Sequence, residues 1–110
     1  MKLVSVPLTT EALHRLDLDE SLPGDIEELE LSDEDYALIY KSGALDKINS
    51  SLGKMLDEYE DESIQGRSSL SASLIIFNEA YNTTRYDVIS RIISLNKIAI
   101  ENDTGMFFYL

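Results

Sequence analysis

The stretch Leu56-Asp57-Glu58-Tyr59-Glu60-Asp61-Glu62 carries five carboxylates in its last six positions. It closes a pattern of apolar side chains that recur every three or four residues, as they do along one face of a helix. The members of this stripe are Leu45, Ile48, Leu52, Met55 and Tyr59, with Leu56 beside them. The pattern predicts one helix over 44–62 that ends in the acidic run.

The acidic run is unfavourable for the helix that we predict to contain it. Two pairs of carboxylates, Asp57/Asp61 and Glu58/Glu62, are four residues apart, and like charges at that spacing repel by about 0.2–0.5 kcal/mol per pair. Acids near a helix C-terminus also oppose the helix dipole, at about 0.3–1 kcal/mol each. Since the local structure gains nothing from these charges, a binding partner is our leading explanation for them.

Length and composition indicate one domain, residues 1–110, with a real core. The chain has 110 residues, of which 44% are apolar and 27% charged, which is typical of a globular protein. No apolar run approaches the roughly 20 residues of a membrane span, and the opening run over 1–7 is too short for a signal peptide. We therefore expect a cytoplasmic protein. Cysteine is absent, which excludes disulfides and thiolate chemistry.

The net charge of −12 is concentrated in the first part of the chain. Residues 1–62 hold 17 of the 21 acids but five of the nine lysines and arginines, whereas residues 63–110 hold four of each sign. Direct binding to nucleic acid is disfavoured because no basic patch is available to contact phosphates. An anionic membrane is disfavoured for the same reason. A basic partner or metal cations would suit this field, although acidity can also serve solubility alone.

The remaining patterns predict an α+β fold that is mainly helical. Helices are expected over 32–42, 44–62, 68–81 and 84–101, packed on a small ribbon formed by strands 2–6 and 106–110. A short helix is expected over 9–16, and an acidic loop with one turn of helix at most over 17–30, where Pro23-Gly24 signals a turn. Ser32 and Asp35 form a capping box at the start of the helix over 32–42, and Gly43 ends that helix.

Candidates for catalysis are few. His14 is the one histidine, and a single histidine more often serves packing or the surface than catalysis. The serines near residue 70 lack a recognisable base and acid, and the five glycines are isolated rather than grouped in a phosphate-binding loop. The spacing of a calcium loop is absent from 17–30 and from 57–66. We predict no enzyme activity, no catalytic residue, no metal ligand and no cofactor.

Two dense acidic clusters differ in their local explanation. The cluster over 33–35 begins a helix, where acids complement the dipole, but the run over 57–62 has no such role. Carboxylates that steer a basic partner and an aromatic anchor are typical of an interface. Tyr59 lies on the apolar stripe, which favours a core position over an anchoring one. The predicted partner-binding residues are Asp57, Glu58, Tyr59, Glu60, Asp61, Glu62, Asp19 and Glu20; Asp17, Asp25, Glu27 and Glu28 could extend the same surface.

Four segments carry a resemblance to a group of known proteins. They are 31–36 (Leu-Ser-Asp-Glu-Asp-Tyr), 42–49, 55–64 and 99–110. In style and order they resemble small immunity proteins of bacterial polymorphic toxin systems, including contact-dependent growth inhibition. The resemblance implies a cytoplasmic inhibitor that binds a cognate toxin, often a basic nuclease, and blocks its active site or substrate surface. It assigns no individual contact residue, because such proteins vary in fold and binding mode.

These observations leave three functional hypotheses. The first is an immunity protein whose acidic face, centred on 57–62, binds and neutralises a basic nuclease toxin. The alternative is an acidic nucleic-acid mimic that inhibits a host defence nuclease or a DNA-binding protein. A mimic should spread its charge along an extended face, whereas the net charge here stops near residue 62, which favours a local patch. The third is a small enzyme or metal-binding domain.

Overall fold

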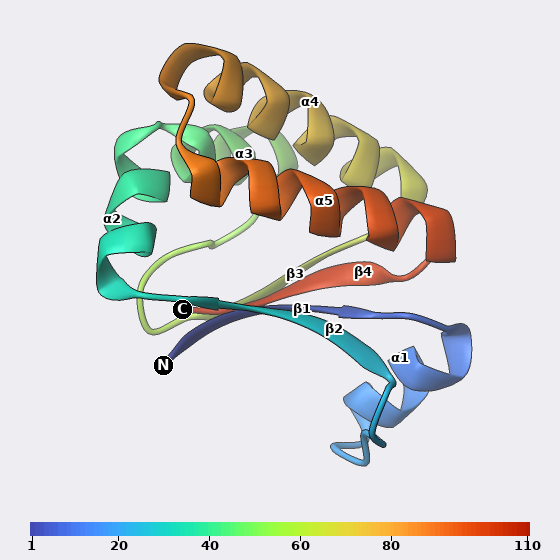
Figure 1. Ribbon diagram of the computed structural model, residues 1–110. Coiled ribbons are helices and arrows are strands. Elements are labelled where there is room, and N and C mark those ends of the chain that lie inside the picture. The colour runs from blue at the N-terminus through green and yellow to red at the C-terminus, as the bar shows by residue number, and fades with distance from the viewer.

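The computed structural model describes residues 1–110 as one four-stranded antiparallel sheet with helices packed on it (Figure 1). The strands are β1 (Lys2–Pro7), β2 (Ile26–Leu31), β3 (Asp61–Gln65) and β4 (Gly105–Tyr109), in the spatial order β2-β1-β4-β3. The helices are α1 (Thr10–Asp17), α2 (Asp33–Lys41), α3 (Ala44–Leu52), α4 (Arg67–Thr84) and α5 (Asp87–Asn102). The predicted α+β, mainly helical fold is confirmed.

The centre of the sheet is the predicted ribbon. β1 and β4 pair antiparallel, with Val4 opposite Phe108, and both side chains are buried. The two chain ends consequently lie close together (Figure 1). The ribbon is widened on both sides by strands that we did not predict, because β2 pairs with β1 and β3 pairs with β4.

The predicted acidic loop over 17–30 is wrong in its second half, which contains β2. This strand reads Ile-Glu-Glu-Leu-Glu-Leu, and glutamate is depleted in strands. Its pairing along the whole length of β1 overrides that weak local preference.

The predicted helix over 44–62 is also wrong in its second half. α3 ends at Leu52, and Gly53 follows in the left-handed region at φ 65°. The side chain of Asn49 then holds the departing chain, because it accepts a hydrogen bond from the Leu56 amide (2.8 Å) and donates one to the Leu56 carbonyl (3.1 Å). Leu56 is buried as predicted, but Tyr59, which we expected in the core, is 89% exposed.

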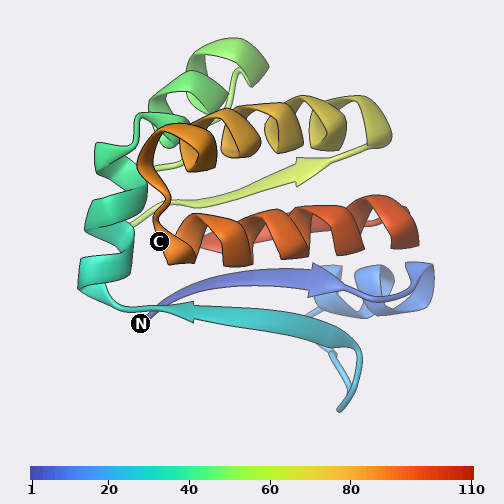
Figure 2. The ribbon, with the colours of Figure 1, turned by 45° about the horizontal axis from the view of Figure 1, so that its top comes forward.

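The helices α2 to α5 cover one face of the sheet and form the core with it (Figure 1). α5 lies over the central strands, and α4 packs between α5 and α3 (Figure 2). The start of α2 follows a local rule: Ser32 and Asp35 make the predicted capping box, with hydrogen bonds of 3.0 and 3.2 Å. The helix expected over 68–81 extends to Thr84, and the next begins three residues after its predicted start. No helix has the length and apolarity needed to cross a membrane.

The core includes one buried polar network between α4 and α5. The Asn96 amide donates to the Leu70 carbonyl (2.9 Å) and accepts from the Ser73 hydroxyl (2.8 Å). Both polar side chains are fully buried, and the network links the two helices.

Candidate acidic binding surface

One face of the sheet is free of the large helices, and α1 lies against one end of it (Figure 1). Val4 and Val6 point into the core, so Leu3 and Ser5 point to this open face, because side chains alternate along a strand. The strand register then gives two rows across the sheet. They are Glu30-Leu3-Tyr109-Asp61 and Glu28-Ser5-Phe107-Ser63.

Carboxylates from separate parts of the sequence lie near enough to Tyr109 to affect its ionisation. Burial raises the pKa of the Tyr109 hydroxyl, and the negative charges of Asp61, Asp17, Asp19 and Glu28 raise it further. These acids come from β3, the end of α1, the turn after α1, and β2. With Glu30 they form the open-face patch, which we define as Asp17, Asp19, Glu28, Glu30 and Asp61. All five are exposed, and the two rows contain no lysine or arginine.

A second acidic site lies on the other side of the loop that joins α3 to β3. It is a hollow of about 510 Å³, which we call the tyrosine hollow, lined by Asp33, Tyr36, Ala37, Tyr40, Asp57 and Glu58. The Tyr36 hydroxyl donates to Asp57 Oδ1 at 3.4 Å. Burial and the charge of Asp57 raise the pKa of Tyr36, so this hydroxyl keeps its proton at neutral pH.

The structure divides the predicted run over 57–62 between these two sites. Asp57 and Glu58 line the tyrosine hollow, whereas Asp61 begins β3 and points to the open face. Tyr59 and Glu60 lie exposed at the tip between them, and Tyr59 has a positive φ of 68°. The run is therefore a loop and a strand start rather than one helical face.

Glu62, also predicted to bind the partner, has a local structural role. Its carboxylate accepts hydrogen bonds from the backbone amides of Met55 (3.0 Å) and Ser63 (2.9 Å). Lys54 approaches it at 4.0 Å. These contacts hold the loop over 54–60 against the start of β3.

The loop acids behave differently from one another. Asp19 joins Asp61 near Tyr109, while Glu20 lies exposed in the turn after α1. Asp25, which we expected to extend the acidic surface, is buried instead. It pairs with Arg15 through two contacts of 2.7 Å and accepts from the Leu22 amide at 2.9 Å. These contacts lower the pKa of Asp25 to about 2.

The sequence did not identify three tyrosines that lie at these two acidic sites: Tyr36, Tyr40 and Tyr109. The spacing of Tyr36 and Tyr40 by four residues shows that they share a helix face. Their placement beside Asp57 depends on how the loop after α3 returns. Likewise, only the register of β3 and β4 brings Tyr109 and Asp61 together.

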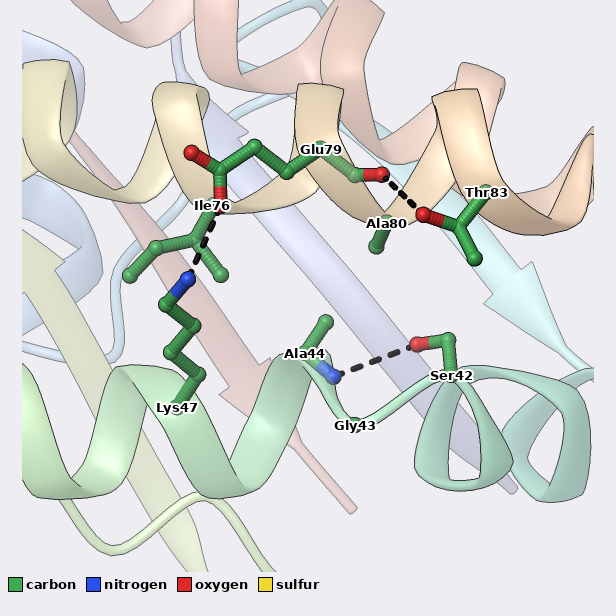
Figure 3. Close-up of a pocket in the computed structure, with 8 residues that line it drawn as sticks. All are labelled: Ser42, Gly43, Ala44, Lys47, Ile76, Glu79, Ala80 and Thr83. Atoms are coloured by element: carbon green, nitrogen blue, oxygen red, sulfur yellow. Dashed lines mark hydrogen bonds and ion pairs between the residues drawn. The ribbon is translucent and has the colours of Figure 1, made fainter.

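A further hollow, between the α2–α3 turn and α4, has a volume of about 190 Å³ (Figure 3). Its two charged side chains neutralise each other, because Lys47 Nζ lies 2.8 Å from Glu79 Oε2. The Thr83 hydroxyl donates to the Glu79 carbonyl at 3.0 Å. This hollow is a packing seam with its polar groups paired, and it adds nothing to the acidic surface.

Comparison with known proteins gives one structural similarity. No family model matches the chain, and no curated protein matches its sequence. The chain is similar in structure to the Neisseria DNA mimic protein DMP12, with a TM-score of 0.68 over 100% of both chains and 16% sequence identity. At this identity, the similarity shows that the two chains share a fold.

Proposed function

We propose that this protein is a nucleic-acid mimic that binds a basic nucleic-acid-binding protein through the open-face patch. The observation that carries the proposal is the convergence of four exposed carboxylates from three separate parts of the chain: Asp61 lies opposite Tyr109 in the sheet, and the charges of Asp61, Asp17, Asp19 and Glu28 all raise the pKa of Tyr109. The structural similarity to a protein named as a DNA mimic supports the same function.

The open-face patch is costly for the fold. Glu28 and Glu30 place two like charges on the same face of β2, and no lysine or arginine shares the two rows to offset their repulsion. Asp17 is the last residue of α1, where an acid opposes the negative end of the helix dipole. Because folding does not favour this arrangement, binding is the better explanation for it.

The patch spreads charge over an area that suits a mimic. The sequence suggested a local patch, since the net charge stops near residue 62, but the fold places β2 and β3 at opposite edges of the sheet. Glu28 and Glu30 lie two residues apart on one strand, about 6.8 Å, and a row from β2 to β3 crosses three strand spacings, about 14 Å. Duplex DNA presents phosphates about every 3.4 Å along each strand, on both sides of a major groove about 12 Å wide. The separations between carboxylates in the patch are thus of the same order as those between phosphates on duplex DNA.

The expected mechanism is occlusion. Lysine and arginine side chains that contact phosphates in the partner's nucleic-acid complex would contact the carboxylates of the patch instead. Such a surface speeds association through long-range attraction, and the attraction weakens as salt concentration rises. The sheet holds the backbone of Glu28, Glu30 and Asp61 in fixed positions, so the backbone of these residues needs no ordering on binding.

The immunity hypothesis is a narrower form of this proposal. An immunity protein against a basic nuclease toxin would use the same surface and the same mechanism, with the toxin as its dedicated partner. The identity of the captured protein separates the two forms: a secreted nuclease toxin indicates immunity, whereas a resident DNA-binding protein or defence nuclease indicates a general mimic.

The test compares two variants of equal charge. The immobilised chain captures proteins from a lysate of its native host, and mass spectrometry identifies them. One variant neutralises the open face (Glu28→Gln, Glu30→Gln, Asp61→Asn). The control neutralises three exposed acids of the helical side (Asp46→Asn, Glu101→Gln, Asp103→Asn).

We expect the wild type and the control to capture the same basic nucleic-acid-binding protein, and the open-face variant to bind it about tenfold more weakly or not at all. Equal losses in both variants would show that only net charge matters. Undiminished capture by the open-face variant would contradict the proposed surface.

A further inference from the structure

The tyrosine hollow combines two aromatic rings with carboxylates that come from other segments. Tyr36 and Tyr40 lie one turn apart on α2, with their ring centroids 6.4 Å apart and their planes at 35°. Asp57 and Glu58 approach from the loop after α3, and Asp33 from the start of α2. Tyr40 is 53% exposed although it is a large aromatic residue, so its ring is open to a partner.

One cation of the chain, the Lys2 ammonium, already contacts residues that line the tyrosine hollow. The Lys2 ammonium lies 5.3 Å from the centre of the Tyr36 ring, 3.0 Å from Glu58 and 3.1 Å from Asp33. The Lys2 side chain is 11% exposed. A cation placed over an aromatic face is attracted to the negative potential of the ring, more strongly the further it is desolvated. This intramolecular contact shows that an aromatic ring and carboxylates of the hollow together can hold a positive charge.

Lys2 leaves part of the hollow unused. Three carboxylates line the hollow against one ammonium, and Lys2 pairs with Asp33 and Glu58 but not with Asp57. Asp57 accepts from the Glu58 amide at 2.8 Å and from the Tyr36 hydroxyl at the long distance of 3.4 Å, both through Oδ1. Its second oxygen and the exposed Tyr40 ring remain available to a second cation.

We infer that the tyrosine hollow is a binding site for one arginine side chain of the partner protein. The flat guanidinium stacks on the Tyr40 ring and donates hydrogen bonds to Asp57, a combination of contacts that a lysine ammonium makes less well. The inference rests on the proposed function for the identity of the partner as a basic protein. It adds a point of anchoring to the open-face patch, from which the hollow is separated by Tyr59 and Glu60 at the loop tip.

The test uses capped arginine (N-acetyl-arginine amide) as the probe and the whole chain labelled with nitrogen-15 for NMR. We expect saturable shifts, with a dissociation constant on the order of millimolar, at Ala37, Tyr40 and Glu58, and weaker binding of capped lysine. Asp57→Asn keeps an oxygen for the Glu58 amide, and Tyr40→Ala removes an exposed ring, so both variants should fold.

Each of these variants should weaken arginine binding at least threefold. The control Glu60→Gln removes the same charge from the same loop, outside the hollow, and should bind arginine as the wild type does. Shifts that do not saturate, or equal weakening by Glu60→Gln and Asp57→Asn, would overturn the inference. Its failure is distinguishable from failure of the proposed function, because the open-face variant should lose the partner and still bind capped arginine.

Discussion

Asp61 and Tyr109 lie directly opposite each other in the β3–β4 pair, on the sheet face that no large helix covers. After burial, the negative charge of Asp61 is the strongest influence that raises the pKa of Tyr109. The pair joins β3, an edge strand that begins with the end of the acidic run, to β4, the last strand of the chain. It is the point where carboxylates distant in sequence become one surface.

The first prediction concerns the ionisation of Tyr109. Asp61→Asn should lower the pKa of Tyr109, because removal of a nearby negative charge favours the tyrosinate form. The pKa should remain above its ordinary value, since burial and the other carboxylates persist. NMR titration of the Tyr109 ring, assigned with Tyr109→Phe, measures the change. The control Glu101→Gln should leave the pKa where it is, and an equal decrease in the control would contradict the local origin of the effect.

A second prediction follows from the backbone of Tyr59. Its φ of 68° is unfavourable for a side chain, by about 1–2 kcal/mol, and its ring is almost fully exposed. Tyr59→Gly should therefore raise the free energy of unfolding by about 0.5–1 kcal/mol, after the entropic cost of glycine. Urea denaturation measures this difference. Glu60→Gly, at a neighbouring exposed position without a positive φ, should lower the stability, and a similar effect of both substitutions would contradict the account.

A third prediction concerns the buried network of Ser73 and Asn96. Asn96→Ala should lower the free energy of unfolding by about 2–3 kcal/mol, because it removes two hydrogen bonds and leaves a cavity between α4 and α5. Ser73→Ala alone should cost about 1 kcal/mol. Since the two side chains share a hydrogen bond of 2.8 Å, the double variant should lose less than the sum of the single losses. Additive losses in urea denaturation would show that the two residues act separately.

The fourth prediction is a pH dependence from Asp25. Its pKa is lowered from 3.8 to about 2 by Arg15 and the Leu22 amide, so the folded protein binds this proton less well than the unfolded chain does. The resulting stabilisation is complete above about pH 4 and is lost as the pH falls towards 2. The melting temperature of Asp25→Asn should thus be lower than that of the wild type at pH 7, and the two should converge at low pH. A constant difference across this range would contradict the assignment, and Asp46→Asn serves as the control.

The parts of the fold that the sequence predicts are those with strong local patterns. The capping box at Ser32 and the apolar strand over 106–110 are in place, and β1 and β4 pair as expected. β2 was missed because its three glutamates are more typical of a loop than of a strand. The strand forms because it pairs with β1 along its whole length. The helix over 44–62 was extended too far because the apolar spacing continues past Gly53, where a left-handed residue ends α3.

Only part of the candidate surface could be predicted, because the sequence shows which residues are acidic but not which contacts they make in the fold. Asp57, Asp61 and Asp19 are visible as exposed acids in the sequence, and the structure places all three on the two acidic sites. Glu62 and Asp25 look equivalent to them in sequence, but backbone amides and Arg15 engage these two in local contacts. The positions of Tyr36, Tyr40 and Tyr109 beside these acids can be assigned only when the strand register and the path of the loop after α3 are known.

The central claim is that the open-face patch takes the place of nucleic acid on a basic protein. The most direct measurement adds the chain to a complex of the captured partner with fluorescently labelled duplex DNA, and follows the anisotropy of the DNA. The account predicts that the DNA is released, and that the apparent Kd of the chain rises in proportion to the concentration of competing duplex. A ternary complex, in which the chain binds its partner at undiminished affinity while the DNA stays bound, would contradict it.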